Sequence, residues 1–157
     1  DAVTLHAYMG RDSVQPFLGR TGKWAVVLGL TSNSGAADFQ EKTAADGRPF
    51  YRHMVEAALS WGSHEDTMLV VGATRPEALA ALRADFPQHF FLVPGIGAQG
   101  GDLEAVIRAG CTSHNNLIIN ASRSILYASS GSDFAEKARE AAQDLSKKMA
   151  DLMTGRP

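Results

Sequence analysis

Apolar runs alternate with amphipathic segments along the whole chain. Continuous apolar runs are typical of strands buried on both faces in a parallel sheet, whereas apolar residues three or four positions apart indicate helices. The sequence predicts strands at residues 2–5, 24–30, 68–72, 90–94 and 117–120. It predicts a short helix within 12–18 and longer helices at 50–61, 76–86, 102–109 and 133–152, while 36–49 is interpreted as a loop or irregular helix. Regular alternation of this kind favours an α/β fold with a parallel sheet and right-handed crossovers.

Composition narrows the class of protein. The chain has 157 residues, of which 45% are hydrophobic and 20% are charged, with a formal net charge of −2. These values are typical of a soluble globular domain and give no electrostatic reason to expect nucleic acid or an anionic membrane as partner. The single cysteine, Cys111, excludes an intrachain disulfide and fits a reducing cytoplasm. No apolar run approaches the roughly 20 residues of a membrane span.

Two successive strands are followed by residues suited to a phosphate group. Residues 94–101 read Pro-Gly-Ile-Gly-Ala-Gln-Gly-Gly, and Asp102 then opens a helical pattern. Glycines let backbone N–H groups approach a ligand, and a helix start adds free donors and a positive dipole end. The next strand leads into Ser122, Arg123 and Ser124, which offer an arginine and two hydroxyls. We expect both loops to hold one phosphate group between them.

Two α/β folds are compatible with such a loop. The spacing of Gly95, Gly97 and Gly100 matches the dinucleotide-binding pattern, but that fold needs an acidic residue about 20 positions later. The chain has Asn120 and Arg123 in that region instead. A (β/α)₈ barrel places a phosphate site after its last two strands and usually needs more than about 200 residues. We therefore expect residues 1–157 to be the C-terminal part of one barrel, covering its last five strand–helix units without the first three.

Five segments in order carry a family resemblance. They are residues 1–4 with 8–14, 30–35, 71–76, 92–101 and 120–125, and the run at 94–101 is the most specific. Together they resemble the orotidine 5′-phosphate decarboxylase family, most closely its bacterial form with a longer chain. The resemblance covers essentially the whole chain, as the fourth through eighth strand–helix units of the barrel.

The resemblance implies roles for residues on the pyrimidine side of the site. Ser32 looks like the serine that hydrogen-bonds the amide edge of the pyrimidine. Pro94 and Ile96 would form the wall of the base pocket.

Three further residues would bind the phosphate. Gln99 looks like the glutamine that reaches the phosphate from a closing loop, and Arg123 looks like the phosphate-binding arginine. The backbone N–H groups of Ser122 and Arg123 would lie beside that phosphate. The family often has glycine where Ser122 stands, and serine allows the same backbone contact with a narrower range of dihedral angles.

The family's reaction depends on residues that this chain lacks. Its Asp-x-Lys-x-x-Asp motif lies at the end of the third strand, upstream of residue 1, so no catalytic residue is expected here. The resemblance implies conversion of orotidine 5′-monophosphate to UMP in de novo pyrimidine biosynthesis, without metal or organic cofactor, in a cytoplasmic homodimer. The chain would provide the binding half, acting with the missing N-terminal half, and is expected to be inactive alone. Alternatives are another phosphate-binding barrel enzyme, such as a sugar-phosphate synthase, aldolase or epimerase, or a non-catalytic binding fragment.

Several other polar residues have simpler interpretations. Asp38 and Asp102 are expected to be helix-start carboxylates rather than catalytic acids. Four histidines fall in helix or loop positions and are interpreted as surface residues: His53, His64, His89 and His114.

Overall fold

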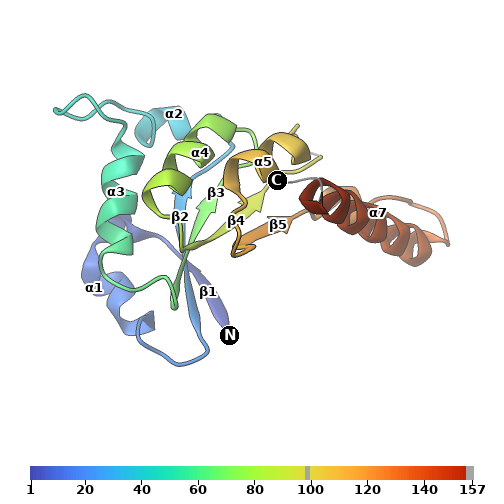
Figure 1. Ribbon diagram of the computed structural model, residues 1–157, viewed down its shortest axis with the longest axis horizontal. Coiled ribbons are helices and arrows are strands. Elements are labelled where there is room, and N and C mark those ends of the chain that lie inside the picture. The colour runs from blue at the N-terminus through green and yellow to red at the C-terminus, as the bar shows by residue number, and fades with distance from the viewer. Residues whose placement is uncertain (98–99, 155–157) are drawn as a thin grey trace.

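The computed structural model describes residues 1–97 and 100–154, and its five strands form one parallel sheet (Figure 1). The strands are β1 (Ala2–Leu5), β2 (Trp24–Leu30), β3 (Thr67–Val71), β4 (Phe90–Pro94) and β5 (Leu117–Asn120). Their order in the sheet is the same as their order in the chain, and every neighbouring pair is parallel. This confirms the predicted α/β class and all five predicted strands, with β3 shifted by one residue.

Helices follow the strands at the predicted positions, and a further short helix at Arg123–Leu126 was not predicted. They are α1 (Arg11–Val14), α2 (Ala36–Phe39), α3 (Phe50–Leu59), α4 (Pro76–Asp85), α5 (Leu103–Gly110), α6 (Arg123–Leu126) and α7 (Phe134–Thr154), with 3₁₀ turns at Ala7–Met9 and Gln15–Phe17. The segment interpreted as a loop or irregular helix contains α2 and an isolated antiparallel bridge between Thr43 and Pro49. Because these connections are helical and the strands parallel, the carboxyl ends of all five strands meet at one edge of the sheet.

The main core lies between the sheet and the helices α3, α4 and α5, which cover one of its faces (Figure 1). Fully buried side chains from the strands and helices meet there: Val55, Leu69, Val71, Leu79, Phe91, Val93 and Val106. Burying a large aliphatic or aromatic side chain contributes about 1.5–3 kcal/mol, so this layer provides most of the driving force for folding.

The opposite face of the sheet is also apolar but lies outside the core that the described helices form. Because side chains alternate along a strand, this face is formed by Trp24, Val26, Leu28, Met68, Val70, Phe90, Leu92 and Ile118. The rings of Trp24 and Phe90 come from β2 and β4, on either side of β3, yet their centroids are 5.5 Å apart. Rings this close across an intervening strand indicate a face that is curved inward, as in the wall of a barrel.

A buried arginine that the sequence reading did not identify connects the amino-terminal ends of β4 and β5. Arg83 lies on α4 and is only 6% exposed, whereas arginine side chains are usually exposed to solvent. Its guanidinium donates to five backbone carbonyls, at Phe86, Pro87, His89, Gly110 and Asn116, at 2.7–3.3 Å. It also lies 3.7 Å from the centroid of the Phe91 ring. Arg83 thus holds together the turn before β4, the end of α5 and the residue before β5.

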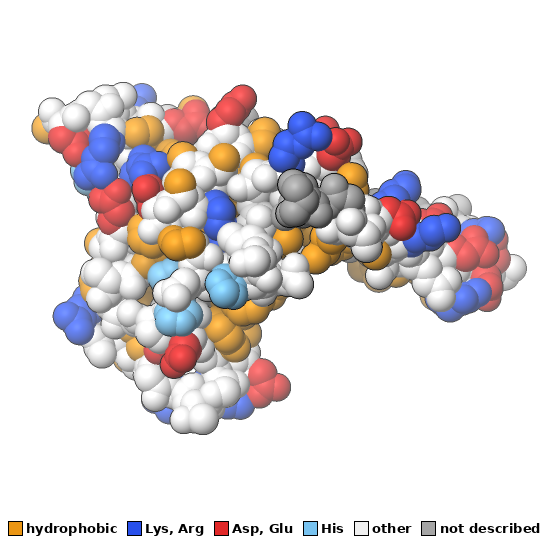
Figure 2. Space-filling model, in the orientation of Figure 1, with side chains coloured by type: hydrophobic (Ala, Val, Ile, Leu, Met, Phe, Trp, Pro, Cys, Tyr) orange, Lys and Arg blue, Asp and Glu red, His pale blue; other side chains and the backbone are white. Residues whose placement is uncertain are grey.

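The C-terminal helix α7 projects beyond β5 and away from the sheet (Figure 1). Acidic and basic side chains alternate over its surface (Figure 2), and none of its residues is fully buried. Leu145 packs against the main core, whereas Phe134 at its start is 60% exposed. The helix is therefore anchored to the rest of the chain through only part of its apolar stripe.

Candidate functional site

Three loops with candidate binding residues lie at the carboxyl edge of the sheet. We call residues 31–35 after β2 the serine loop, residues 95–101 after β4 the glycine loop, and residues 121–124 after β5 the arginine loop. Strand β3 separates the serine loop from the glycine loop, while the strands before the glycine and arginine loops are direct neighbours. In parallel α/β sheets this edge is where ligands bind.

The glycine loop has a backbone that other residues rarely adopt. Gly95, Gly97 and Gly100 have φ values of 102°, 76° and 81°, in the region that favours glycine. The Gly100 N–H donates to the Gly97 carbonyl at 2.9 Å, so a hydrogen bond joins these two glycines. Gln99, predicted to reach the phosphate, lies outside the described residues.

Asp102 ends this loop and begins α5 as a capping residue. Its Oδ1 accepts hydrogen bonds from the N–H groups of Glu104 at 2.9 Å and Ala105 at 3.4 Å. This confirms the interpretation of Asp102 as a helix-start carboxylate, and Asp38 lies likewise in the first turn of α2.

The arginine loop lies directly against the glycine loop. A Cβ built on Gly97 would be 3.6 Å from the Ser124 Oγ, which is ordinary van der Waals contact. Arg123 is exposed and is the first residue of α6. The Ser122 carbonyl accepts from Ile125 and Leu126, so the N–H groups of Arg123 and Ser124 precede the first donors within the helix.

The serine loop is held by an amide side chain from α2's end. The Gln40 Oε1 accepts from the Thr31 N–H at 2.9 Å, and its Nε2 donates to the Thr31 Oγ1 at 2.8 Å. The next residue, Ser32, has a buried Oγ that makes no hydrogen bond with any described residue. This hydroxyl faces the backbone of Gly72, at the end of β3.

Pro94 is the last residue of β4, and Ile96 lies at the start of the glycine loop. The Pro94 carbonyl accepts from the Ala73 N–H at 2.9 Å. Ile96 is 7% exposed and packs with the main core, and it forms a bridge with Gly101 across the glycine loop. Pro94 and Ile96 therefore fix the start of the glycine loop against the end of β3 and against Gly101.

The prediction that all four of these histidines are surface residues is wrong for His89. His89 packs its ring edge-on against Phe86 at 5.7 Å and His64 at 6.2 Å, and its Nε2 is buried. Burial, together with the nearby His64 and Arg83, lowers the pKa of His89. Histidine side chains gather on the face shown in Figure 2. Because His64 and His89 each precede a strand, they lie at the amino edge of the sheet, opposite the three loops.

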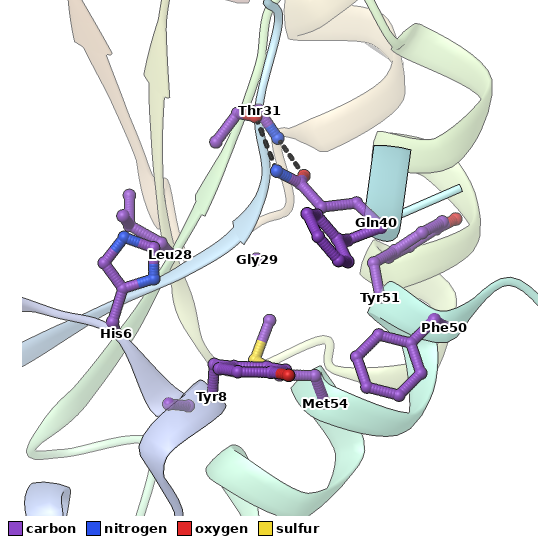
Figure 3. Close-up of a pocket in the computed structure, with 11 residues that line it drawn as sticks. His6, Tyr8, Leu28, Gly29, Thr31, Gln40, Phe50, Tyr51 and Met54 are labelled. Atoms are coloured by element: carbon purple, nitrogen blue, oxygen red, sulfur yellow. Dashed lines mark hydrogen bonds between the residues drawn. The ribbon is translucent and has the colours of Figure 1, made fainter. Parts of the chain in front are cut away.

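The structure also contains an apolar hollow that the sequence analysis did not predict (Figure 3). It has a volume of about 290 Å³ and lies beside the last residues of β2, where β1 has already ended. Aromatic and apolar side chains line most of it, including Tyr8, Phe39, Phe50, Tyr51 and Met54. None of the described residues predicted to bind substrate lines this hollow. The nearest connection is Thr31, which lines it and precedes Ser32.

Two classes of site are not found in the part of the chain that the structure describes. Residues 1–97 and 100–154 contain no group of three or more His, Cys, Asp or Glu side chains placed to hold a metal ion. Among the same residues, no helix has the length and apolar character needed to cross a membrane.

Comparison with known proteins adds a family to this geometry. Residues 1–141 match the profile of the orotidine 5′-phosphate decarboxylase / HUMPS family. The chain is 47% identical over 150 residues to an orotidine 5′-phosphate decarboxylase of Christiangramia forsetii, covering 96% of this chain and 55% of that protein. It is 49% identical over 147 residues to one of Cellvibrio japonicus, covering 92% and 54%. The chain thus spans about half the length of the curated relatives it matches.

Solved structures show the same arrangement of elements. A UMP synthase structure of Leishmania donovani aligns with a TM-score of 0.77 and 41% identity, covering 92% of this chain and 32% of that one. A putative orotidine-monophosphate-decarboxylase of Toxoplasma gondii aligns with a TM-score of 0.78 and 32% identity, covering 98% and 59%. Together with the parallel sheet, these similarities confirm the predicted (β/α)₈ barrel class.

Proposed function

The chain belongs to the orotidine 5′-phosphate decarboxylase / HUMPS family, and we propose that it provides the pyrimidine- and phosphate-binding half of an orotidine 5′-phosphate decarboxylase. The reaction is loss of CO₂ from orotidine 5′-monophosphate, in which a proton replaces the carboxylate on ring carbon six and UMP is formed. This step belongs to de novo pyrimidine biosynthesis. The reaction in this family needs no metal or organic cofactor.

The observation that carries this proposal is the closeness of the glycine and arginine loops. A Cβ built on Gly97 would lie 3.6 Å from the Ser124 Oγ, so one phosphate group at this edge can contact both loops. Arg123 would form charge-assisted hydrogen bonds with the phosphate, and Gln99 would reach it from the glycine loop. The N–H groups of Ser122 and Arg123 would complete the phosphate site. Energy from binding this remote group can be used to close and desolvate the reacting end.

The pyrimidine would lie toward the serine loop, with Pro94 and Ile96 forming its wall. The Ser32 Oγ is buried and has no hydrogen-bond partner among the described residues. A buried hydroxyl without a partner is costly, by about 1–3 kcal/mol. Rotation of the Ser32 side chain toward the amide edge of a bound pyrimidine would satisfy it. The serine would then select for a pyrimidine by hydrogen bonding.

The apolar, helix-free face of the sheet supports a further part of the proposal: an upstream half closes the barrel. Trp24, Phe90 and Ile118 lie on a face that no described helix covers, and Ile118 is 38% exposed. β1 and β5 are both edge strands, and open edges of this kind pair with other strands. We place residues 1–157 as the C-terminal part of a single barrel domain. The upstream half would contribute the Asp-x-Lys-x-x-Asp motif, whose lysine stabilises the charge at ring carbon six and delivers the proton.

We further propose that the assembled enzyme is a cytoplasmic homodimer. In this family the active site takes an aspartate from the neighbouring subunit, so two copies are needed. The large exposed apolar side chains around the hollow support a contact surface there, because Tyr8, Met9 and Phe39 are 72%, 75% and 71% exposed. Neither nucleic acid nor a membrane is proposed as a partner.

The test is decarboxylation by this chain co-expressed with the upstream part of the Christiangramia forsetii relative. We expect the pair to convert orotidine 5′-monophosphate to UMP and the chain alone to be inactive. Sugar phosphates serve as competing substrates, because a sugar-phosphate enzyme would prefer them. An assembled pair that turns over a sugar phosphate and ignores orotidine 5′-monophosphate would refute the proposal.

Arg123→Ala in the assembled pair tests the phosphate site itself. Removing a charge-assisted contact costs about 1.5–3 kcal/mol, so UMP affinity should fall roughly ten- to hundredfold. Affinity for uridine, which has no phosphate, should stay the same. Arg108→Ala on α5 is the matched control, because this side chain is 80% exposed and pairs with Glu104. Equal losses for UMP and uridine would contradict the assignment of Arg123.

A further inference from the structure

Two small residues at the end of β3 separate the serine loop from the glycine loop. Gly72 and Ala73 follow the strand directly, and both are buried. The Gly72 N–H donates to the Leu30 carbonyl of β2 at 2.8 Å, while the Ala73 N–H donates to the Pro94 carbonyl of β4 at 2.9 Å. Because consecutive residues donate in opposite directions, this pair joins the ends of the two strands that lead into these loops.

Gly72 leaves no room for a side chain on the serine-loop side. A Cβ at this position would lie 2.8 Å from the Ser32 backbone nitrogen and would overlap the Ser32 Oγ. The backbone of Gly72 is not in the left-handed region, so close approach rather than conformation requires glycine here. The obstacle includes backbone, which cannot swing away as the end of a flexible side chain does. Any larger residue at position 72 must therefore displace the serine loop.

Ala73 has the same relation to the glycine loop. A Cβ built on Gly101 would be 2.5 Å from the Ala73 Cβ and 2.8 Å from the Gly95 carbonyl oxygen. The Gly101 N–H donates to that Gly95 oxygen at 3.2 Å, so the loop is closed over the Ala73 methyl group. The size of residue 73 thus sets how closely the glycine loop approaches β3.

We propose that Gly72 and Ala73 are positioning residues that set the separation between the serine loop and the glycine loop. This inference rests on the proposed function, in which one loop binds the pyrimidine and the other binds the phosphate of the same nucleotide. A nucleotide gains affinity from both ends only when the two loops stand at the distance that its ribose spans. A shift of one loop would leave each end able to bind alone but would reduce the advantage of having both.

The test uses Gly72→Ala in the pair assembled with the upstream half, with UMP, uridine and inorganic phosphate as ligands. Overpacking at a tight site predicts a loss of roughly tenfold in UMP affinity. Competition by inorganic phosphate should change by less than about twofold, because the glycine and arginine loops keep their contact. The ratio of UMP to phosphate affinity is thus the readout that general destabilisation would not move.

Gly62→Ala, in the turn that precedes β3, is the matched control. Its Cβ would meet the Thr67 Cγ2 at 2.6 Å and the Asp66 Oδ1 at 2.9 Å, so it also overlaps its neighbours, but these are side-chain atoms distant from the loops. This variant should lose stability and keep its ratio of UMP to phosphate affinity. Equal ratios in Gly62→Ala and Gly72→Ala would overturn the positioning role while the proposed function stands. A parent pair that binds no UMP would overturn both.

Compensation between positions 73 and 101 gives an independent test. Gly101→Ala should weaken UMP binding roughly tenfold, because the new methyl group collides with that of Ala73. Adding Ala73→Gly removes this collision but leaves the contact with the Gly95 oxygen, so we expect part of the UMP affinity to return. A double variant that binds UMP no better than Gly101→Ala would contradict the role of Ala73.

Discussion

Replacement of Arg83 by methionine tests how the amino edge of the sheet is stabilised. The substitution keeps an unbranched chain against the Phe91 ring but removes every donor of the guanidinium. Two carbonyls, those of Phe86 and Gly110, accept only from Arg83 among the described residues. The others keep a second donor, because Asn116 Nδ2 also reaches two of them and the Phe91 N–H reaches the third.

The expected loss follows from those two carbonyls. Each acceptor left without a partner costs about 1–3 kcal/mol, which gives roughly 2–6 kcal/mol. Part of this is offset, because Arg83→Met also removes the cost of burying a charge that forms no salt bridge within the described residues. Burial lowers the pKa of Arg83 to about 10, so the side chain is still charged at neutral pH. We therefore expect the free energy of unfolding to fall by about 3 kcal/mol.

Urea unfolding of the parent, Arg83→Met, Arg83→Lys and Arg108→Met measures this effect. Arg83→Lys keeps the positive charge but removes the planar guanidinium with its several donors, so its loss of unfolding free energy should lie between those of the parent and Arg83→Met. Arg108→Met should change stability by less than about 0.5 kcal/mol, because this exposed side chain forms only a surface salt bridge with Glu104. The reasoning is refuted if the Arg83 and Arg108 variants lose the same free energy of unfolding.

Two smaller predictions concern the ends of the sheet. Asp102→Ala removes the cap of α5 and should lower the free energy of unfolding by about 1 kcal/mol, measured by urea titration. Asp102→Asn should keep most of the stability that the cap provides. His89 has a pKa lowered by burial and by His64 and Arg83, with Asp66 acting in the opposite direction. The unfolded chain, with a histidine pKa of about 6.5, therefore binds more protons than the folded one just below that pH. The contribution of His89 to the free energy of unfolding should be constant above about pH 6.5 and fall as the pH drops toward the folded-state pKa of His89. His89→Gln should flatten the plot of unfolding free energy against pH in this range. An unchanged slope in His89→Gln would contradict the role of His89.

The strands and helices were predictable because their signals are local. Continuous apolar runs such as 24–30 and 90–94 became β2 and β4, in which buried core side chains alternate with apolar side chains on the face that no described helix covers. Asp102 was identified as a helix start because the positive end of the helix dipole stabilises a carboxylate there, and its hydrogen bonds to α5 agree.

Features that depend on contacts distant in sequence were not predictable. Arg83 occupies an ordinary position on an amphipathic helix, and only the fold brings the carbonyls of Gly110 and Asn116 to it. His89 was interpreted as a surface residue because it falls in a helix or loop position, but Phe86 at the end of α4 and His64 in the turn before β3 pack against its ring. The close approach of Gly72 to Ser32 likewise joins residues 40 positions apart.

The candidate site was predictable only in part. The family resemblance assigned roles to Ser32, Pro94, Ile96, Ser122 and Arg123, and these residues lie at one edge of the sheet because each follows or ends a parallel strand. The apolar hollow of Figure 3 had no such signal, because Tyr8 comes from the β1–β2 connection, Phe39 and Phe50 come from two helices of the β2–β3 connection, and the three share no motif.

Hydrogen exchange of the assembled pair with and without UMP tests the central claim most directly. The account predicts slower exchange in the serine loop, the glycine loop and the arginine loop together, since one nucleotide contacts all three. Residues 36–54, which line much of the apolar hollow, should be unaffected. Protection confined to the hollow, with exchange unchanged in the three loops, would contradict the account.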